Sequence, residues 1–211
     1  MGFKRSKNHL PPYYAAPVIR HEIVEKYPEV VTTLNRLSGL INDSIMTELN
    51  YRVDYLKQTP EVVASNFLKS KNLLLPPRNV YKATIRLGCK IFGEPYIFLH
   101  MYRLLLKGFT DFKVETKTGL GGTKICFDAL TNKQIDLYPE YTGTGLLVIL
   151  QTKNNIVQQM IGNKERVYEF VKKEFMNQYN IKWLKPIGFN NAYDLMMRKK
   201  QADERRIGSI S

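Results

Sequence analysis

The stretch IDLYPEYTGTG, residues 135–145, begins as a strand and ends as a turn. Its first seven residues predict a short strand, and the glycines and threonines after it predict a tight turn. The stretch holds two tyrosines, two threonines and two acids. Three kinds of site fit such a turn: the loop of a nucleotide enzyme, an adhesive surface, or a cage for a small cation.

Strands and helices alternate around this stretch from residue 82 onward. Further strands are predicted for KATIRLGCK (82–90) and FKVETKTG (112–119). Helices are predicted for 94–108, 122–133, 144–151 and 164–179, and two extended pieces for 181–199. Such alternation indicates βαβ units and a mainly parallel sheet.

The region before residue 73 shows a different pattern. PPYYAAPVIR (11–20) is predicted to be extended, because its prolines oppose a helix. Four helices are expected after it, over 21–27, 28–39, 42–57 and 59–72, with Asn42 and Thr59 as N-caps and Pro28 and Pro60 in first turns. We expect no strand in this region, and LLLPPRNVYK (73–82) is predicted to be a connector.

Composition excludes several function classes. The net charge of +13 is spread along the chain, so no nucleic-acid partner is expected. Two cysteines and three scattered histidines do not form a metal-binding pattern, and we expect no metal, cofactor or catalytic group. We expect the two cysteines to be small buried residues, and the sequence does not decide whether they form a disulfide. The N-terminus lacks the apolar stretch of a signal peptide.

Two segments are candidate ligand sites. GLGGT (119–123) is a glycine-rich turn between a strand and a helix, but it completes neither known phosphate-loop pattern. YPEYTGTG lies at the C-terminal end of a predicted parallel strand, where open α/β sheets bind ligands. Its tyrosine faces suit a quaternary ammonium, which cannot donate a hydrogen bond. PPYYAAP and FNNAYDL supply further tyrosines that could converge there.

Residues 116–145 together with WLKPIGFNNAYDLMMRK (183–199) resemble the substrate-binding proteins of osmoprotectant ABC transporters, which bind glycine betaine, choline, carnitine or proline betaine. Residues 11–54 resemble the C-terminal end of that family, and residues 82–108 resemble its N-terminal start. The resemblance implies an α/β fold: one lobe of a type II periplasmic-binding-protein fold, with a mainly parallel central sheet flanked by helices.

The order of the two segments is reversed relative to the family. The resemblance implies one ligand-binding lobe over 9–211 in circularly permuted order. Residues 9–75 correspond to the family's C-terminal segment, 76–81 to the joint, and 82–211 to its N-terminal segment; the second lobe is expected to be absent. A junction between two tandem binding domains would give the same order.

The resemblance also implies site residues. Tyr13, Tyr141 and Tyr193 would form an aromatic cage, Thr144 would bind the ligand's carboxylate or hydroxyl end, and Lys90 would line the cleft. Tyr14, Tyr138 and Asn191 complete the candidate set. The chain departs from the family at four positions where polar residues are usual: Cys89, Ile91, Gly93 and Pro95.

The function implied is solute binding without catalysis. A quaternary-ammonium osmoprotectant would be captured outside the cytoplasm, in the periplasm or on the outer face of the cell membrane, and passed to a membrane permease. A second lobe or a dimer partner would close the site. The alternative is an interaction module that no longer binds solute and docks on a permease or exchanges segments in a dimer. A third reading is an enzyme that uses GLGGT for a phosphate.

Overall fold

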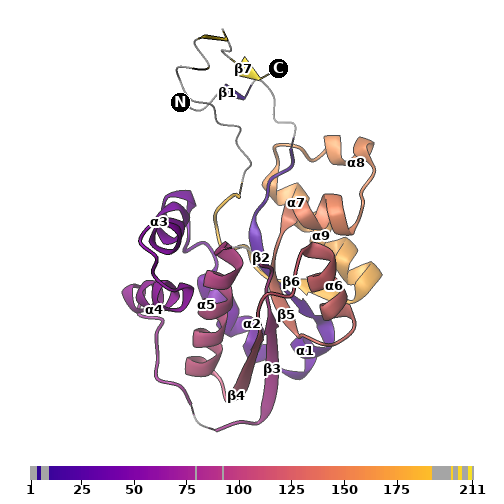
Figure 1. The fold of residues 1–211 in the computed structure, drawn as a ribbon. Coiled ribbons are helices and arrows are strands. Elements are labelled where there is room, and N and C mark those ends of the chain that lie inside the picture. Colours follow the sequence, from indigo (N-terminus) through magenta and orange to yellow (C-terminus); the bar gives the residue numbers. More distant parts are fainter. Residues whose placement is uncertain are drawn as a thin grey trace.

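The chain is described by a computed structural model that covers residues 4–5, 10–78, 80–91, 93–191, 201, 204–205 and 209–210. Its centre is a five-stranded sheet of order β4-β3-β5-β2-β6 (Figure 1). The strands are β2 (Ala15–Arg20), β3 (Ala83–Gly88), β4 (Phe112–Lys117), β5 (Leu137–Tyr141) and β6 (Ile181–Trp183). A separate pair, β1 (Lys4–Arg5) and β7 (Ser209–Ile210), is parallel.

Four of the five strands run in one direction, as a mainly parallel sheet predicts, and β2 runs opposite to them. β3 runs parallel to β4 over its whole length and parallel to β5 at Leu87 and Leu137. β2 runs antiparallel to both of its neighbours, β5 and β6, so those two strands share one direction. Four strands therefore end at the same edge of the sheet, which is where ligand sites of open α/β sheets lie.

β2 corrects one expectation. Residues 11–20 are extended as predicted, but the expectation that this region contains no strand is wrong, because β2 lies inside the sheet. Pro17 lies opposite Pro139 in β5. Backbone hydrogen bonds between β2 and β5 are made by Tyr14 and Arg20, and each of these is three residues from Pro17. Residue pairs in an antiparallel ladder alternate between hydrogen-bonded and non-hydrogen-bonded, so Pro17 and Pro139 form a non-hydrogen-bonded pair. Neither proline therefore removes a hydrogen bond between these two strands.

Helices cover both faces of the sheet. Figure 1 shows α3, α4 and α5 on one side and α6 and α9 on the other. The helices are α1 (His21–Lys26), α2 (Pro28–Leu34), the 3-10 turn η1 (Asn35–Leu37), α3 (Asp43–Asp54), α4 (Pro60–Ser70), α5 (Gly93–Phe109), α6 (Thr123–Thr131), α7 (Thr142–Thr144), α8 (Asn154–Gln158) and α9 (Lys164–Tyr179).

Two apolar cores lie on the two faces of the sheet. In β2, Ala15 and Ile19 belong to the core under α5, whereas Ala16 and Val18 belong to the core under α6 and α9. β5 alternates in the same way, since Tyr141 joins the first core and Tyr138 the second. Side chains of a strand alternate between faces, so these two tyrosines point in opposite directions.

The helix predicted for 144–151 is replaced by a short helix and a wider π-helical turn. α7 passes into a π-helical turn over Gly145–Ile149, in which the Leu150 N–H donates to the Gly145 carbonyl. Two glycines, Gly143 and Gly145, weaken a regular helix here. Gly145 also lies close against Trp183, where a Cβ would come within 2.8 Å of the indole.

Local start signals are confirmed. The Asn42 and Thr59 side chains accept hydrogen bonds from the N–H groups of Ile45 and Val62, and Pro28 and Pro60 are the first residues of α2 and α4. Across the described ranges, no helix combines the length and the apolar character that crossing a membrane requires.

Candidate functional site

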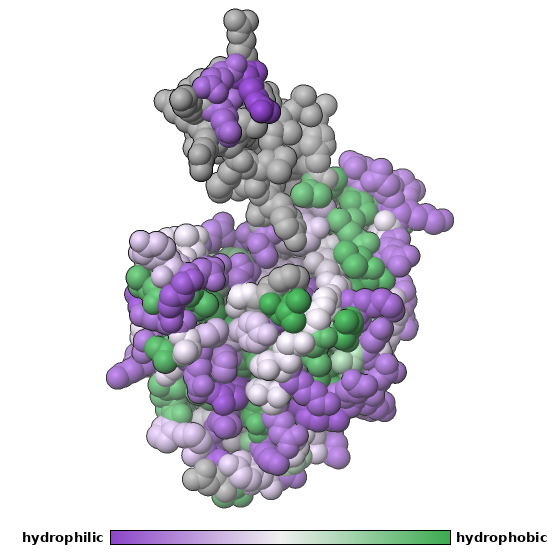
Figure 2. Space-filling view, viewed as in Figure 1, coloured by the Kyte–Doolittle hydropathy of each residue, from purple (hydrophilic) through white to green (hydrophobic). Residues whose placement is uncertain are grey.

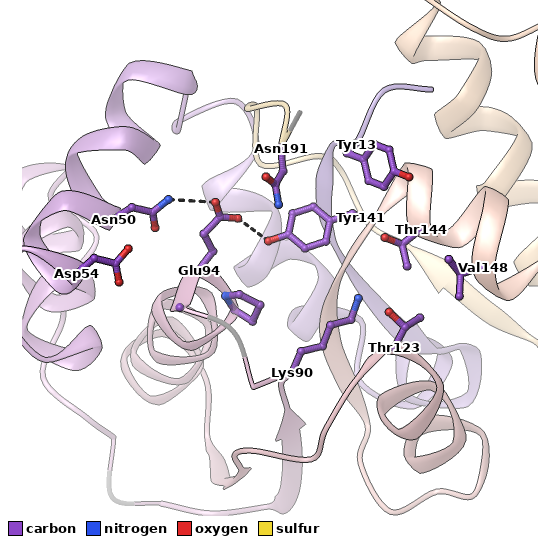
Figure 3. Close-up of a pocket in the computed structure, with 12 residues that line it drawn as sticks. Tyr13, Asn50, Asp54, Lys90, Glu94, Thr123, Tyr141, Thr144, Val148 and Asn191 are labelled. Atoms are coloured by element: carbon purple, nitrogen blue, oxygen red, sulfur yellow. Dashed lines mark hydrogen bonds between the residues drawn. The ribbon is translucent and has the colours of Figure 1, made fainter. Parts of the chain in front are cut away.

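A cavity of about 580 Å³ opens at the edge of the sheet where the parallel strands end. Figure 3 shows its lining side chains, which come from both halves of the chain. We call it the Tyr13–Tyr141 pocket. Five of the eight candidate residues line it: Tyr13, Lys90, Tyr141, Thr144 and Asn191.

Tyr141 is the last residue of β5, and its ring is held by polar contacts. Its hydroxyl donates a hydrogen bond of 2.6 Å to the Glu94 carboxylate at the start of α5. Asn191 also hydrogen-bonds the Tyr141 side chain. Burial and, next, the charge of Glu94 hold the pKa of Tyr141 well above its usual value, so the hydroxyl remains a donor.

Tyr13 approaches from the extended segment before β2. Its backbone N–H donates to the Asn190 side chain at 2.8 Å, and its carbonyl accepts from the Asn191 N–H at 2.9 Å. Its ring lies against Gly143, where an added Cβ would come within 2.6 Å of two ring atoms. Glycine at this position therefore determines where the Tyr13 ring can lie.

Thr142 joins the N-terminal segment to the end of β5. Its hydroxyl donates to the Pro12 carbonyl at 2.8 Å and accepts from the Tyr14 N–H at 3.0 Å. Thr144, two residues on, is half-buried and lines the pocket. The turn that was predicted to hold the ligand thus also fixes the segment that carries Tyr13.

Lys90 lies in the turn after β3 and is 3% exposed. Its ammonium is 2.5 Å from the Glu140 carboxylate and 5.7 Å from the centre of the Tyr141 ring. The Tyr138 hydroxyl donates to the other Glu140 oxygen at 3.0 Å. Lys90 therefore lines the pocket, but its charge is balanced by the buried Glu140 carboxylate.

One wall of the pocket is acidic, and the sequence reading did not identify it. Asn50 on α3 donates to Glu94 at 3.0 Å, and Asp54 lies one helical turn further along α3 (Figure 3). The spacing of Asn50 and Asp54 places both on one helix face. That spacing was visible in the sequence, but nothing in it says whether such a face meets solvent or a cavity.

Two of the remaining candidate residues, Tyr138 and Tyr14, lie elsewhere. Tyr138 was grouped with the ligand site, but it is fully buried on the opposite face of the sheet, since it is an odd number of residues from Tyr141. Tyr14 is half-buried with the Lys164 ammonium 5.5 Å from its ring centre, and it does not line the pocket. Tyr193 lies outside the described residues.

GLGGT forms the tight turn between β4 and α6 that its glycines predicted. Gly119 and Gly121 have φ values of +65° and +122°, a region that favours glycine. Thr123, the first residue of α6, also lines the pocket. Within the described part of the chain, no group of histidine, cysteine or acidic residues could hold a metal ion.

The comparison with protein families gives a specific match. The family described as "Substrate binding domain of ABC-type glycine betaine transport system" matches residues 4–70 and 83–211. The chain belongs to this family. It is a family of transport substrate-binding domains and not of enzymes, which supports the expectation of binding without catalysis.

Individual relatives match over shorter stretches. The ergothioneine transport permease/ergothioneine binding protein EgtU of Helicobacter pylori is 46% identical over 33% of this chain and 13% of its own length. The glycine-betaine-binding protein of Pseudomonas aeruginosa is 41% identical over 34% of this chain and 23% of its own length. The glycine betaine-binding protein YehZ of Escherichia coli is 30% identical over 60% of this chain and 40% of its own length.

These matches span well under half of the relatives' lengths. Among solved structures, NikA from Brucella suis aligns with 83% of this chain and 45% of its own, with a TM-score of 0.38 and 8% identity. A likeness this weak says nothing about function. The assignment of the chain therefore rests on the family match.

Proposed function

We propose that this chain captures a quaternary-ammonium osmoprotectant, such as glycine betaine or choline, and delivers it to the membrane permease of an ABC transporter. The observation that carries the proposal is the convergence of Tyr13 and Tyr141, from distant segments of the sequence, on one cavity. Its volume of about 580 Å³ falls within the range of small-molecule sites.

The pocket offers the chemistry that a quaternary ammonium needs. Aromatic faces attract a cation that has no hydrogen to donate, and the Tyr141 ring already has the Lys90 ammonium over it. Thr123 and Thr144 supply hydroxyls for the polar end of the solute. A cation–π contact is worth about 0.5–2 kcal/mol. Two such contacts are small against the cost of association, so we expect about millimolar or weaker binding by this chain alone.

A second wall would strengthen binding. Three apolar side chains near the pocket, Ile91, Ile125 and Val148, are more than half exposed. Figure 2 shows apolar residues exposed on this view of the molecule among hydrophilic ones. We propose that a second lobe or a partner copy covers this region by a hinge motion, outside the cytoplasm as the resemblance implies.

We also propose that the two segments are in permuted order. The family match falls in two pieces, 4–70 and 83–211, separated near the connector at 76–81. A rearranged chain that starts at residue 82, continues through residue 211 and is linked back to 9–75 should keep the same fold. Its circular dichroism and melting temperature would test this, and failure to fold would contradict it.

The binding proposal is tested by NMR titration of the tyrosine rings with glycine betaine, choline and, because one relative is named for it, ergothioneine. Saturable shifts of Tyr13 and Tyr141, lost in Tyr141→Ala, are expected. The matched control is Tyr81→Ala, since Tyr81 is 55% exposed and precedes β3 at the opposite end of the strand. No shift at tens of millimolar would favour the interaction-module alternative.

A further inference from the structure

The charges around the Tyr13–Tyr141 pocket are unbalanced. Among its described lining residues, three are charged: Asp54, Lys90 and Glu94. Lys90 (+1) is paired with Glu140 (−1), and both side chains are at least 97% buried, so this pair is neutral. Asp54 and Glu94 each contribute a charge of −1, so the pocket lining has a net charge of −2. The chain as a whole has a net charge of +13.

No described residue forms an ion pair with Glu94. Its two carboxylate oxygens accept hydrogen bonds from neutral groups, Asn50 at 3.0 Å and the Tyr141 hydroxyl at 2.6 Å. These contacts fix the carboxylate against the ring that would hold the ligand, without neutralising it. The Lys57 ammonium binds the backbone carbonyl of Asp54, and no described residue pairs with the Asp54 carboxylate either.

We propose that Glu94 makes this pocket selective for cations that carry no carboxylate, such as choline, over zwitterions such as glycine betaine. This inference rests on the proposed binding function and adds the charge class of the solute. A cation in the pocket is attracted by the unpaired Glu94 charge. A zwitterion brings its own carboxylate next to Glu94 and Asp54, and the described lining offers no unpaired cation to receive it.

The size of the preference follows from Coulomb's law. Two unit charges about 6 Å apart change a binding constant about threefold at the dielectric constant of water (about 80) and about a hundredfold at the value typical near a protein surface (about 20), with tenfold between these limits. Neutral donors do not offset this difference, because the hydroxyls of Thr123 and Thr144 serve an alcohol as well as a carboxylate. We therefore expect choline to bind about tenfold more tightly than glycine betaine.

The test compares the dissociation constants of choline and glycine betaine by NMR titration in the wild-type chain and in Glu94→Gln. The glutamine keeps an acceptor for Tyr141 and removes the charge, so the preference for choline should fall at least about threefold. Asp128→Asn is the matched control, since it removes one acid from the exposed surface of α6 and should leave the preference unchanged. If Glu94→Gln acted only through the loss of a structural contact, the binding of both ligands would weaken by the same factor.

Equal binding of the two ligands by the wild type, or an unchanged ratio in Glu94→Gln, would overturn the inference while the binding function stands. Tetramethylammonium separates the two failures, because it tests the tyrosine cage with a bare cation. If none of the three ligands shifts the tyrosines, the binding function fails and the inference fails with it. A wild-type salt series gives a second measurement that needs no variant: added NaCl should weaken choline binding more than betaine binding.

Discussion

The Lys90 ammonium lies 2.5 Å from the Glu140 carboxylate, and the two side chains are 3% and 0% exposed. The pair connects the turn after β3 to β5, and its lysine lines the pocket. Glu140 also accepts hydrogen bonds from the Tyr138 hydroxyl and from the Tyr141 N–H. With these partners the buried charges are balanced and hydrogen-bonded, which is the condition under which a buried ion pair is tolerated.

Breaking this pair should destabilise the fold. Lys90→Met leaves the Glu140 charge buried and unpaired, and we expect a loss of about 3–5 kcal/mol in the free energy of unfolding. In Lys90→Met/Glu140→Gln no charge is left buried, so the double variant should be more stable than the sum of the single losses predicts. Urea denaturation measures all of these values.

The control for this cycle is the exposed pair of Lys124 and Asp128 on α6. Lys124→Met should change the free energy of unfolding by less than about 1 kcal/mol, because exposed pairs contribute little. A Lys90→Met variant as stable as this control would show that the buried pair is not needed for folding.

Gly143 limits the position of Tyr13. In Gly143→Ala the new Cβ would come within 2.6 Å of the Tyr13 ring, so the ring must move away from α7. Loss of one cation–π contact, worth about 0.5–2 kcal/mol, should raise the dissociation constant for choline about two- to thirtyfold. NMR titration with choline measures this change.

Gly145→Ala is the contrasting variant from the same segment. Its Cβ would meet the Trp183 indole at 2.8 Å, in the core on the far face of the sheet. Overpacking there should cost about 1–3 kcal/mol of stability and leave the choline affinity of the folded protein unchanged. If both variants weaken binding equally, the Tyr13 ring has no specific role.

The two cysteines are free and buried. Burial raises the pKa of the Cys89 thiol to about 11 and that of the Cys126 thiol to about 12, so little thiolate exists at neutral pH. A thiol reagent such as DTNB should react with neither in the native protein at pH 8, and with both in urea. Rapid reaction of the native protein would contradict this burial, and absence of thiols in urea would indicate a disulfide.

Local signals in the sequence were sufficient to predict where several helices begin or end. Asn42 and Thr59 cap helices because their side chains bond N–H groups three residues away, which requires no distant partner. The predicted helix over 164–179 has the bounds of α9. β2 was missed as a strand for the opposite reason, because its place depends on pairing with β5 and β6, far along the chain.

The pocket also combines residues that a local pattern places with residues that only distant packing places. Tyr141 ends β5, and Thr144 and Lys90 follow strands that end at the same edge, so a parallel sheet was enough to bring them together. Asn50 and Asp54 reach the pocket only through the packing of α3 beside α5, which no short-range pattern encodes. Tyr138 could have been separated from Tyr141 from the sequence alone, because both lie in the predicted strand and residues an odd number apart point to opposite faces of a sheet.

His100 on α5 should make stability depend on pH. Burial and, next, the Arg103 charge lower its pKa, while Glu61 on α4 opposes this shift. Its Nδ1 has no hydrogen-bond partner among the described residues. A folded pKa below the unfolded value means that the unfolded chain binds more protons, so stability is fully present above about pH 6.5 and falls as the pH is lowered toward the folded pKa.

Urea denaturation at several pH values between 7.5 and 5.5 measures this dependence. In His100→Gln the part that arises from this residue should disappear, so the curve over this range becomes flatter than that of the wild type. The value at pH 7.5 reports any packing loss from the substitution, because His100 is neutral in both states there. A wild-type curve that rises as the pH falls from 7.5 to 6 would mean that the folded state favours the charged imidazole, contrary to its surroundings.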